Sequence, residues 1–178
     1  MNFNSIRNFR LQLLLVISVF PSIAQVSTNE IDFREKNFPG REKEFNAAFD
    51  AFKKGDGFFL RGPAYFEQAL EQYLKAQEFN SNSADLNYQI GLCYLSLGKG
   101  RLNALPFLER ARSLRAQMGI GFMYDLGLAY QYGLDFEKAI KVFEAYIDSM
   151  GSNANPYQIA RADKAIKECE AGIELVKN

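Results

Sequence analysis

The feature of this sequence that most constrains its fold is a block of small and large residues that recurs at a fixed interval. Each block is an alanine followed four residues later by a large side chain, and its alanines are Ala69, Ala104 and Ala139, each 35 positions from the next. A second recurring string contains a glycine between large residues and reads YQIGLCY at 88–94 and YDLGLAY at 124–130. Self-similarity at intervals of roughly 20–50 residues is typical of arrays of stacked supersecondary units. The interval therefore predicts a helical repeat array.

Composition narrows the chemistry that such an array can perform. The chain has 178 residues, 48% of them hydrophobic, and its 21 basic and 21 acidic side chains cancel. A neutral chain of this size predicts one folded domain with no electrostatic preference for nucleic acid. The absence of histidine excludes histidine-based catalytic triads and zinc sites. Since no catalytic, cofactor-binding or metal-binding motif stands out, we expect a protein that is not an enzyme and needs no cofactor or metal.

The first 24 residues have the pattern of an export signal. Arg7 and Arg10 precede the apolar run LQLLLVISVF at 11–20, and the small residues Ser22 and Ala24 precede the predicted cleavage site. The run is shorter than the roughly 20 residues that a transmembrane helix needs. We therefore expect an exported protein that is periplasmic, associated with the outer membrane or secreted, with no membrane span after cleavage. Retention of this segment as an anchor helix stays open.

Helical periodicity and turn residues divide the rest of the chain. The expected segments are an extended lead-in at 25–40, three helix pairs within 41–155 (about 41–80, 84–115 and 122–150) and a terminal helix at 156–178. Ser83 and Asp135 are expected to cap helices. Two glycines near position 55 predict a kink or an early end of the first helix, because each costs about 1 kcal/mol relative to alanine. Leu102 and Val176 are expected to point inward from their helices.

The two cysteines, Cys93 and Cys169, are predicted to be free and buried. Exported proteins often join a pair of cysteines in a disulfide. Here a whole repeat separates the two positions, which places them farther apart than the ~7 Å between Cα atoms that a disulfide allows. A disulfide remains the alternative.

The recurring strings resemble the tetratricopeptide repeat, a helix–turn–helix unit of about 34 residues. LGLAY at 126–130 and IGLCY at 90–94 match the string of its first helix, and the alanine blocks match the string of its second helix. The first helix of the first repeat departs from the pattern, so that either Gly55 or Gly57 is a candidate for the glycine position. The resemblance implies an all-α superhelix of three helix pairs plus a C-terminal capping helix.

A looser resemblance covers NSNSADLNYQIGLCY at 80–94, the ALP block at 104–106 and the pattern Ile166-x-x-Cys169-x-x-Gly172. These segments are similar to the N-terminal repeat region of exported Bacteroidetes envelope proteins that continue into a β-propeller and an OmpA-like domain. The similarity implies a role in a periplasmic envelope complex. Whether the chain is a stand-alone relative or a truncated one stays open.

In tetratricopeptide arrays the first helix of each repeat lines the concave surface. The matching positions form the candidate protein-binding groove, and they are Tyr88, Leu92, Leu95, Ser96, Tyr124, Leu128, Gln131 and Tyr132. Phe52, Phe59 and Leu60 extend the same strip. Tyrosines suit peptide binding because their rings are apolar and their hydroxyls form hydrogen bonds. The alternative is that Tyr88 and Tyr124 only pack between helices.

Taken with the resemblance, these residues predict a non-catalytic scaffold of the bacterial periplasm or cell envelope that binds a peptide or protein segment in the groove. The alternative is a structural module that assembles with copies of itself in an envelope complex. The sequence identifies neither the partner nor the oligomeric state.

Overall fold

The computed structural model describes residues 29–115, 117–151 and 155–177, so the predicted export signal lies outside the described residues. The described chain forms α-helices, three short 3₁₀ helices and no strand. The α-helices are α1 (Glu42–Phe59), α2 (Phe66–Phe79), α3 (Ala84–Ser96), α4 (Ala104–Leu114), α5 (Ile120–Tyr132), α6 (Phe136–Met150) and α7 (Pro156–Lys177). The 3₁₀ helices are η1 (Glu35–Asn37), η2 (Pro63–Tyr65) and η3 (Arg101–Asn103).

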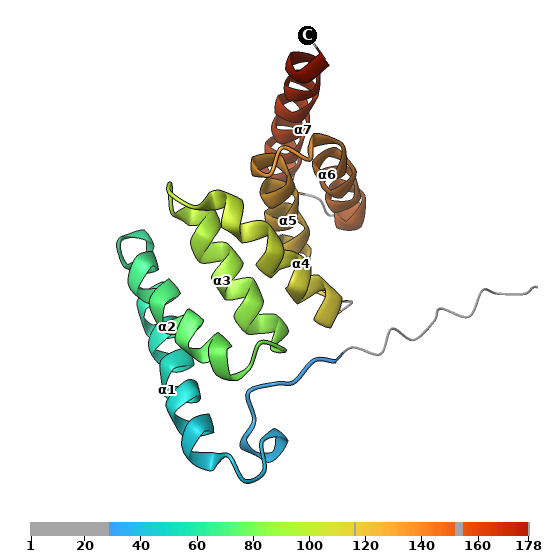
Figure 1. The fold of residues 1–178 in the computed structure, drawn as a ribbon. Helices are drawn as coiled ribbons and strands as arrows, with labels where there is room; N and C mark the ends of the chain where they lie inside the picture. Colours follow the sequence, from blue (N-terminus) through green and yellow to red (C-terminus); the bar gives the residue numbers. More distant parts are fainter. Residues whose placement is uncertain (1–28, 116, 152–154, 178) are drawn as a thin grey trace, which may run out of the picture.

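The helices stack as consecutive antiparallel hairpins (Figure 1). The hairpins are α1–α2, α3–α4 and α5–α6, and α7 packs against α6 at the end of the stack. The second helix of each hairpin contacts the first helix of the next, α2 with α3 and α4 with α5. This arrangement confirms the predicted all-α superhelix of three helix pairs plus a terminal helix. No helix among the described residues is long and apolar enough to cross a membrane.

A glycine in each first helix allows a large buried side chain of the second helix to lie directly against the backbone. A Cβ atom added at any of these glycines would lie 2.5 Å from the facing side chain, and the pairs are Gly55 with Tyr73, Gly91 with Leu108 and Gly127 with Phe143. Atoms in protein interiors do not approach so closely, so no larger residue fits without rearrangement. These glycines are 36 positions apart. The interval assigns the glycine position of the first repeat to Gly55 rather than Gly57.

The early helix end that was one of the two expectations near Gly55 is not observed, because α1 runs without interruption from Glu42 to Phe59. Tyr73 is fully buried against Gly55, and its hydroxyl donates a hydrogen bond of 2.8 Å to the carboxylate of Asp56. The packing of α2 against α1 therefore outweighs the loss of helix stability, about 1 kcal/mol for each glycine.

Of four other local predictions, the two helix caps are confirmed and the two inward-pointing side chains are wrong. The side chains of Ser83 and Asp135 accept hydrogen bonds from backbone N–H groups at the starts of α3 and α6, as predicted. Leu102 is 65% exposed because it falls in η3, ahead of the apolar stripe of α4. Val176 is 78% exposed on the last turn of α7, which projects beyond the neighbouring helices (Figure 1).

The buried apolar side chains form two clusters. One lies among α1, α2 and α3, and the other extends from α3 and α4 to α7. Helix α3 serves both, since Ile90 belongs to the first cluster and Leu95 to the second, while Tyr94 packs against each. Cys93 and Cys169 are free and buried, as predicted, one in each cluster.

Candidate protein-binding groove

The 36-residue interval that relates the glycines also relates the candidate groove positions. Tyr88, Leu92 and Ser96 on α3 correspond to Tyr124, Leu128 and Tyr132 on α5, and Leu95 corresponds to Gln131. The two helices therefore present equivalent faces side by side. Ser96 is exposed, and the side chains at the other positions except Leu95 are half-buried.

Leu95 is the one candidate position that lies in the core. Its side chain is 8% exposed and belongs to the cluster that includes Leu108 and Ala129. At the corresponding position on α5, Gln131 is half-buried. Leu95 therefore supports the groove from beneath and contributes little open surface.

A pocket of about 460 Å³ lies between α5 and α7 and contains half of the candidate groove residues. Helix α5 contributes Tyr124, Leu128, Gln131 and Tyr132. Helix α7 contributes Tyr157, Arg161, Lys164, Ala165 and Glu168. The candidate positions on α3 lie outside this pocket. The two helices thus supply an aromatic and apolar wall from one side and a largely charged wall from the other.

Arg161 is the principal cation of the pocket. Its guanidinium carbon lies 4.4 Å from the ring centroid of Tyr124 and 5.9 Å from that of Tyr157. Among the described residues, no carboxylate lies within ion-pair distance of this guanidinium. A guanidinium stacked on an aromatic ring keeps its N–H edge available for a carboxylate. The pocket therefore suits an acidic group next to an apolar one.

The second cation, Lys164, has a partner within the pocket. Its ammonium nitrogen lies 3.7 Å from the carboxylate of Glu168 on the next turn of α7. Glu168 also accepts a hydrogen bond of 3.0 Å from the side-chain amide of Gln131 on α5. This polar bridge joins α5 to α7 at the edge of the pocket. Because it is exposed, it positions side chains more than it stabilises the fold.

The alternative reading of the two tyrosines is partly correct. The ring of Tyr88 packs edge-on against Phe122 at 5.2 Å, and its hydroxyl donates a hydrogen bond of 2.7 Å to the carboxylate of Asp125. The ring of Tyr124 packs against Phe143 and Tyr146. Since both tyrosines are only half-buried, each contributes to helix packing and also to the surface of the groove.

Burial raises the pKa of Asp125 above the usual range for an aspartate, while the hydrogen bond from Tyr88 and the charge of Arg161 oppose part of that rise. Burial and the neighbouring Asp125 also raise the pKa of Tyr88. A carboxyl group whose pKa rises on folding stabilises the folded state in its protonated form. That stabilisation is present below the unfolded pKa and is lost as pH increases through the folded pKa.

We therefore expect Asp125→Asn to be at least as stable as the wild type at pH 7. As pH falls toward the unfolded pKa of aspartate, about 3.9, the wild-type carboxyl becomes protonated and the advantage of the variant shrinks. Urea unfolding of both proteins at pH 7 and pH 4 measures the difference. An advantage that grows on acidification would contradict the direction of the pKa shift.

The α7 side of the pocket was not predicted from the sequence, because the last helix was assigned only a capping role. The signal was present in the spacing of Tyr157, Arg161, Lys164 and Glu168, which places them on one helix face at steps of three and four residues. The burial of Asp125 was not predictable from the sequence either, since no local pattern indicates that Tyr88 covers it.

Stacked helical hairpins with glycine and alanine at their crossings, together with an open face along α3, α5 and α7, define a tetratricopeptide-like α-solenoid. The crystal structure of MamA protein is similar in fold, with a TM-score of 0.55 and 22% sequence identity over 77% of this chain and 73% of that chain. At this identity the likeness shows the fold alone. No family model matches the sequence, and no curated protein matches it.

Proposed function

We propose that the chain is a non-catalytic scaffold of the bacterial envelope that holds an extended segment of a partner protein in the groove formed by α3, α5 and α7. The observation that carries the proposal is the pocket between α5 and α7, where Arg161 has no carboxylate within ion-pair distance among the described residues and faces a wall of tyrosine and leucine. This combination favours a segment in which an acidic residue accompanies an apolar one.

The fold supports the general class of this function. Tetratricopeptide-like solenoids present extended concave surfaces, and their chemistry is recognition of other proteins. The envelope location is supported by the export-signal pattern of residues 1–24 and by the resemblance of 80–94 to the repeat region of exported envelope proteins.

Tyr132→Ala is expected to weaken partner binding at least tenfold without unfolding the protein. Tyr132 is half-buried at the pocket wall, and tyrosine is enriched among the interface residues whose truncation costs about 1.4 kcal/mol or more, which is about tenfold in affinity. The partner is isolated on immobilised wild-type protein from an envelope extract, and its dissociation constant is then measured by calorimetry against each variant.

Tyr65→Ala is the matched control, because Tyr65 is 38% exposed and lies in η2, at the α1–α2 turn. Arg161→Glu tests the cation of the pocket and is expected to weaken binding at least as strongly as Tyr132→Ala. Equal affinities for the wild type and both groove variants would exclude this pocket as the binding site.

Self-assembly is a second candidate, favoured by the apolar C-terminal end of the array. Leu134 is 70% exposed, Leu175 80% and Val176 78%. Leu134 also has a φ of 61°, a backbone conformation that side-chain-bearing residues rarely adopt. A pocket of about 450 Å³ between the α5–α6 turn and the end of α7 lies beside these residues. Concentration-dependent dimers in sedimentation experiments, lost on Leu134→Ser, would favour this candidate over the groove.

A further inference from the structure

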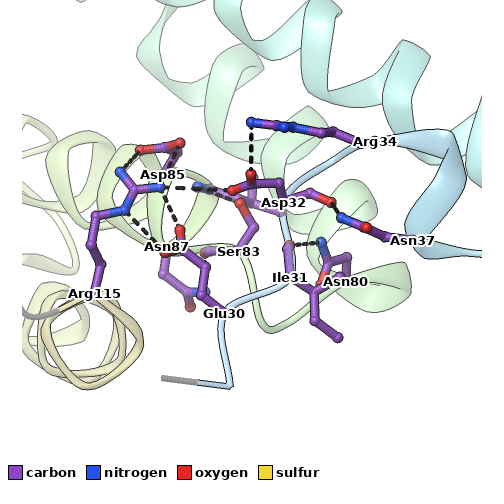
Figure 2. A network of polar contacts seen from close by, with 11 residues as sticks. Glu30, Ile31, Asp32, Arg34, Asn37, Asn80, Ser83, Asp85, Asn87 and Arg115 are labelled. Carbon is purple, nitrogen blue, oxygen red and sulfur yellow. Dashed lines mark hydrogen bonds and ion pairs between the residues drawn. The ribbon is translucent and has the colours of Figure 1, made fainter. Parts of the chain in front are cut away.

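An extended stretch before α1, which we call the arm (Glu30–Phe33), is bound to the array by main-chain contacts. The backbone N–H of Ile31 donates a hydrogen bond of 2.8 Å to the carbonyl of Asn82, in the turn between α2 and α3. The side-chain amide of Asn80, itself buried, donates a hydrogen bond of 2.7 Å to the carbonyl of Ile31 (Figure 2). Both polar backbone groups of one extended residue are thus satisfied, as in the recognition of bound peptides.

The acidic side chains of the arm converge on Arg115, at the end of α4 (Figure 2). The Nε of Arg115 donates to Glu30 at 3.1 Å and a terminal nitrogen donates to the same carboxylate. The guanidinium also donates to Asp85 at 2.6 Å and lies 4.0 Å from Asp32. These hydrogen bonds raise the pKa of Arg115 above its usual value. Paired hydrogen bonds of this kind give both affinity and orientation.

The aromatic end of the arm rests on a tray of phenylalanines, which consists of Phe45, Phe49, Phe52 and Phe79. The ring of Phe33 stacks on Phe52 with centroids 5.2 Å apart and lies 6.4–6.5 Å from the other three rings. By the 36-residue interval, Phe52 is the first-repeat equivalent of Tyr88 and Tyr124. The arm therefore covers the first-repeat part of the same concave face that forms the candidate groove.

We propose that the phenylalanine tray, the α2–α3 turn and Arg115 form a second peptide-docking site, which the arm fills in the free protein and which a partner segment of sequence acid–aliphatic–acid–phenylalanine occupies in its place. The contacts that hold the arm are distant in sequence, 49 positions between Ile31 and Asn80 and 85 between Glu30 and Arg115. An unattached segment of the same sequence has access to the same contacts. The proposal rests on the function of the chain as a protein-binding scaffold and uses none of the α5–α7 pocket residues.

Attachment gives the arm an advantage over any such segment. A tethered group competes at an effective concentration on the order of millimolar, so a free segment with the same contacts binds the wild type weakly. Loosening the arm removes that competition and raises the apparent affinity for the segment.

The test uses a fluorescent peptide with the sequence NEIDFREKNF of residues 29–38 and the full chain. Phe33→Ser in the chain is expected to increase the affinity for this peptide at least tenfold over the wild type. Addition of Arg115→Gln to that variant is expected to reverse most of the gain. The same peptide with serine in place of the phenylalanine that corresponds to Phe33 is expected not to bind.

Because Phe33→Ser removes the ring that packs on the tray, Glu30→Gln provides a milder variant, with Glu35→Gln as its matched control in the exposed part of the segment. Glu30→Gln is expected to raise peptide affinity severalfold and Glu35→Gln to leave it unchanged.

Measurement in a Tyr132→Ala chain separates this site from the α5–α7 pocket, since the peptide should bind that variant with the same affinity as the wild type. The proposal is overturned if neither arm variant binds the peptide more tightly while circular dichroism stays native. It is also overturned if the wild type forms a dimer that Phe33→Ser abolishes, because the arm would then dock onto a second copy.

Discussion

Gly127→Leu is expected to lower the free energy of unfolding by about 1–3 kcal/mol, the usual range for overpacking a buried position. The ring of Phe143, which is fully buried, lies 2.5 Å from where the first added carbon would be. Either the ring leaves its position in the core or α6 moves away from α5. For a chain of this size each kcal/mol corresponds to a decrease of about 2–4 °C in the melting temperature.

Gly121→Leu is the matched control for this prediction, because it makes the same substitution on the same helix. A Cβ atom at Gly121 would meet no atom within 4 Å, and the residue is exposed. Its replacement is expected to leave stability unchanged or to increase it by up to about 1 kcal/mol through helix propensity. Thermal unfolding of both variants measures the difference in stability. Equal destabilisation would mean that the close contact at Gly127 does not limit the size of the residue there.

Tyr73→Ala is expected to cost about 3–5 kcal/mol, the range for removing a buried aromatic side chain. Tyr73 is fully buried between α1 and α3, where it packs against Gly55 and contributes to the first core cluster. Since whole domains have stabilities of about 5–15 kcal/mol, this single change should bring the first repeat close to unfolding.

Tyr73→Phe separates the ring from the hydroxyl. It removes only the hydrogen bond of 2.8 Å to Asp56, a contact expected to contribute about 0.5–1.5 kcal/mol. Asp56 is half-exposed, so its carboxylate can be rehydrated when the hydroxyl is lost. Urea unfolding monitored by circular dichroism measures both variants. If the alanine variant were no less stable than the phenylalanine variant, the buried ring would not be what holds the first hairpin together.

The fold was predictable from the sequence because its stabilising contacts repeat. The glycine and alanine positions recur at nearly constant intervals, so that two clear repeats determine the helix pairs of the whole array. The exception is the first helix, where no string around Gly55 identifies the register. That register is settled by the contact of Gly55 with Tyr73, which lies 18 positions away in the chain, together with the 36-residue interval to Gly91.

The candidate site was predictable only in part, because some of its residues lie outside the repeated segments. The α5 residues of the pocket follow from the repeat pattern, whereas Arg161 lies on a helix outside the matched repeats. The arm has no periodicity, and its partners depend on how distant segments meet in space. Nothing in the local sequence around Glu30 indicates that it reaches Arg115.

The division of the core into two clusters has a mechanical consequence. Among the described residues the two clusters meet at α3, and Phe107 of α4 also packs against the first cluster, so we expect the solenoid to flex at α3. Such flexing changes the curvature of the inner face. The arm restrains this motion, because its Phe33 is seated on the first hairpin while its Glu30 is anchored at the end of α4. Displacement of the arm would therefore remove this restraint and allow the curvature of the inner face to change.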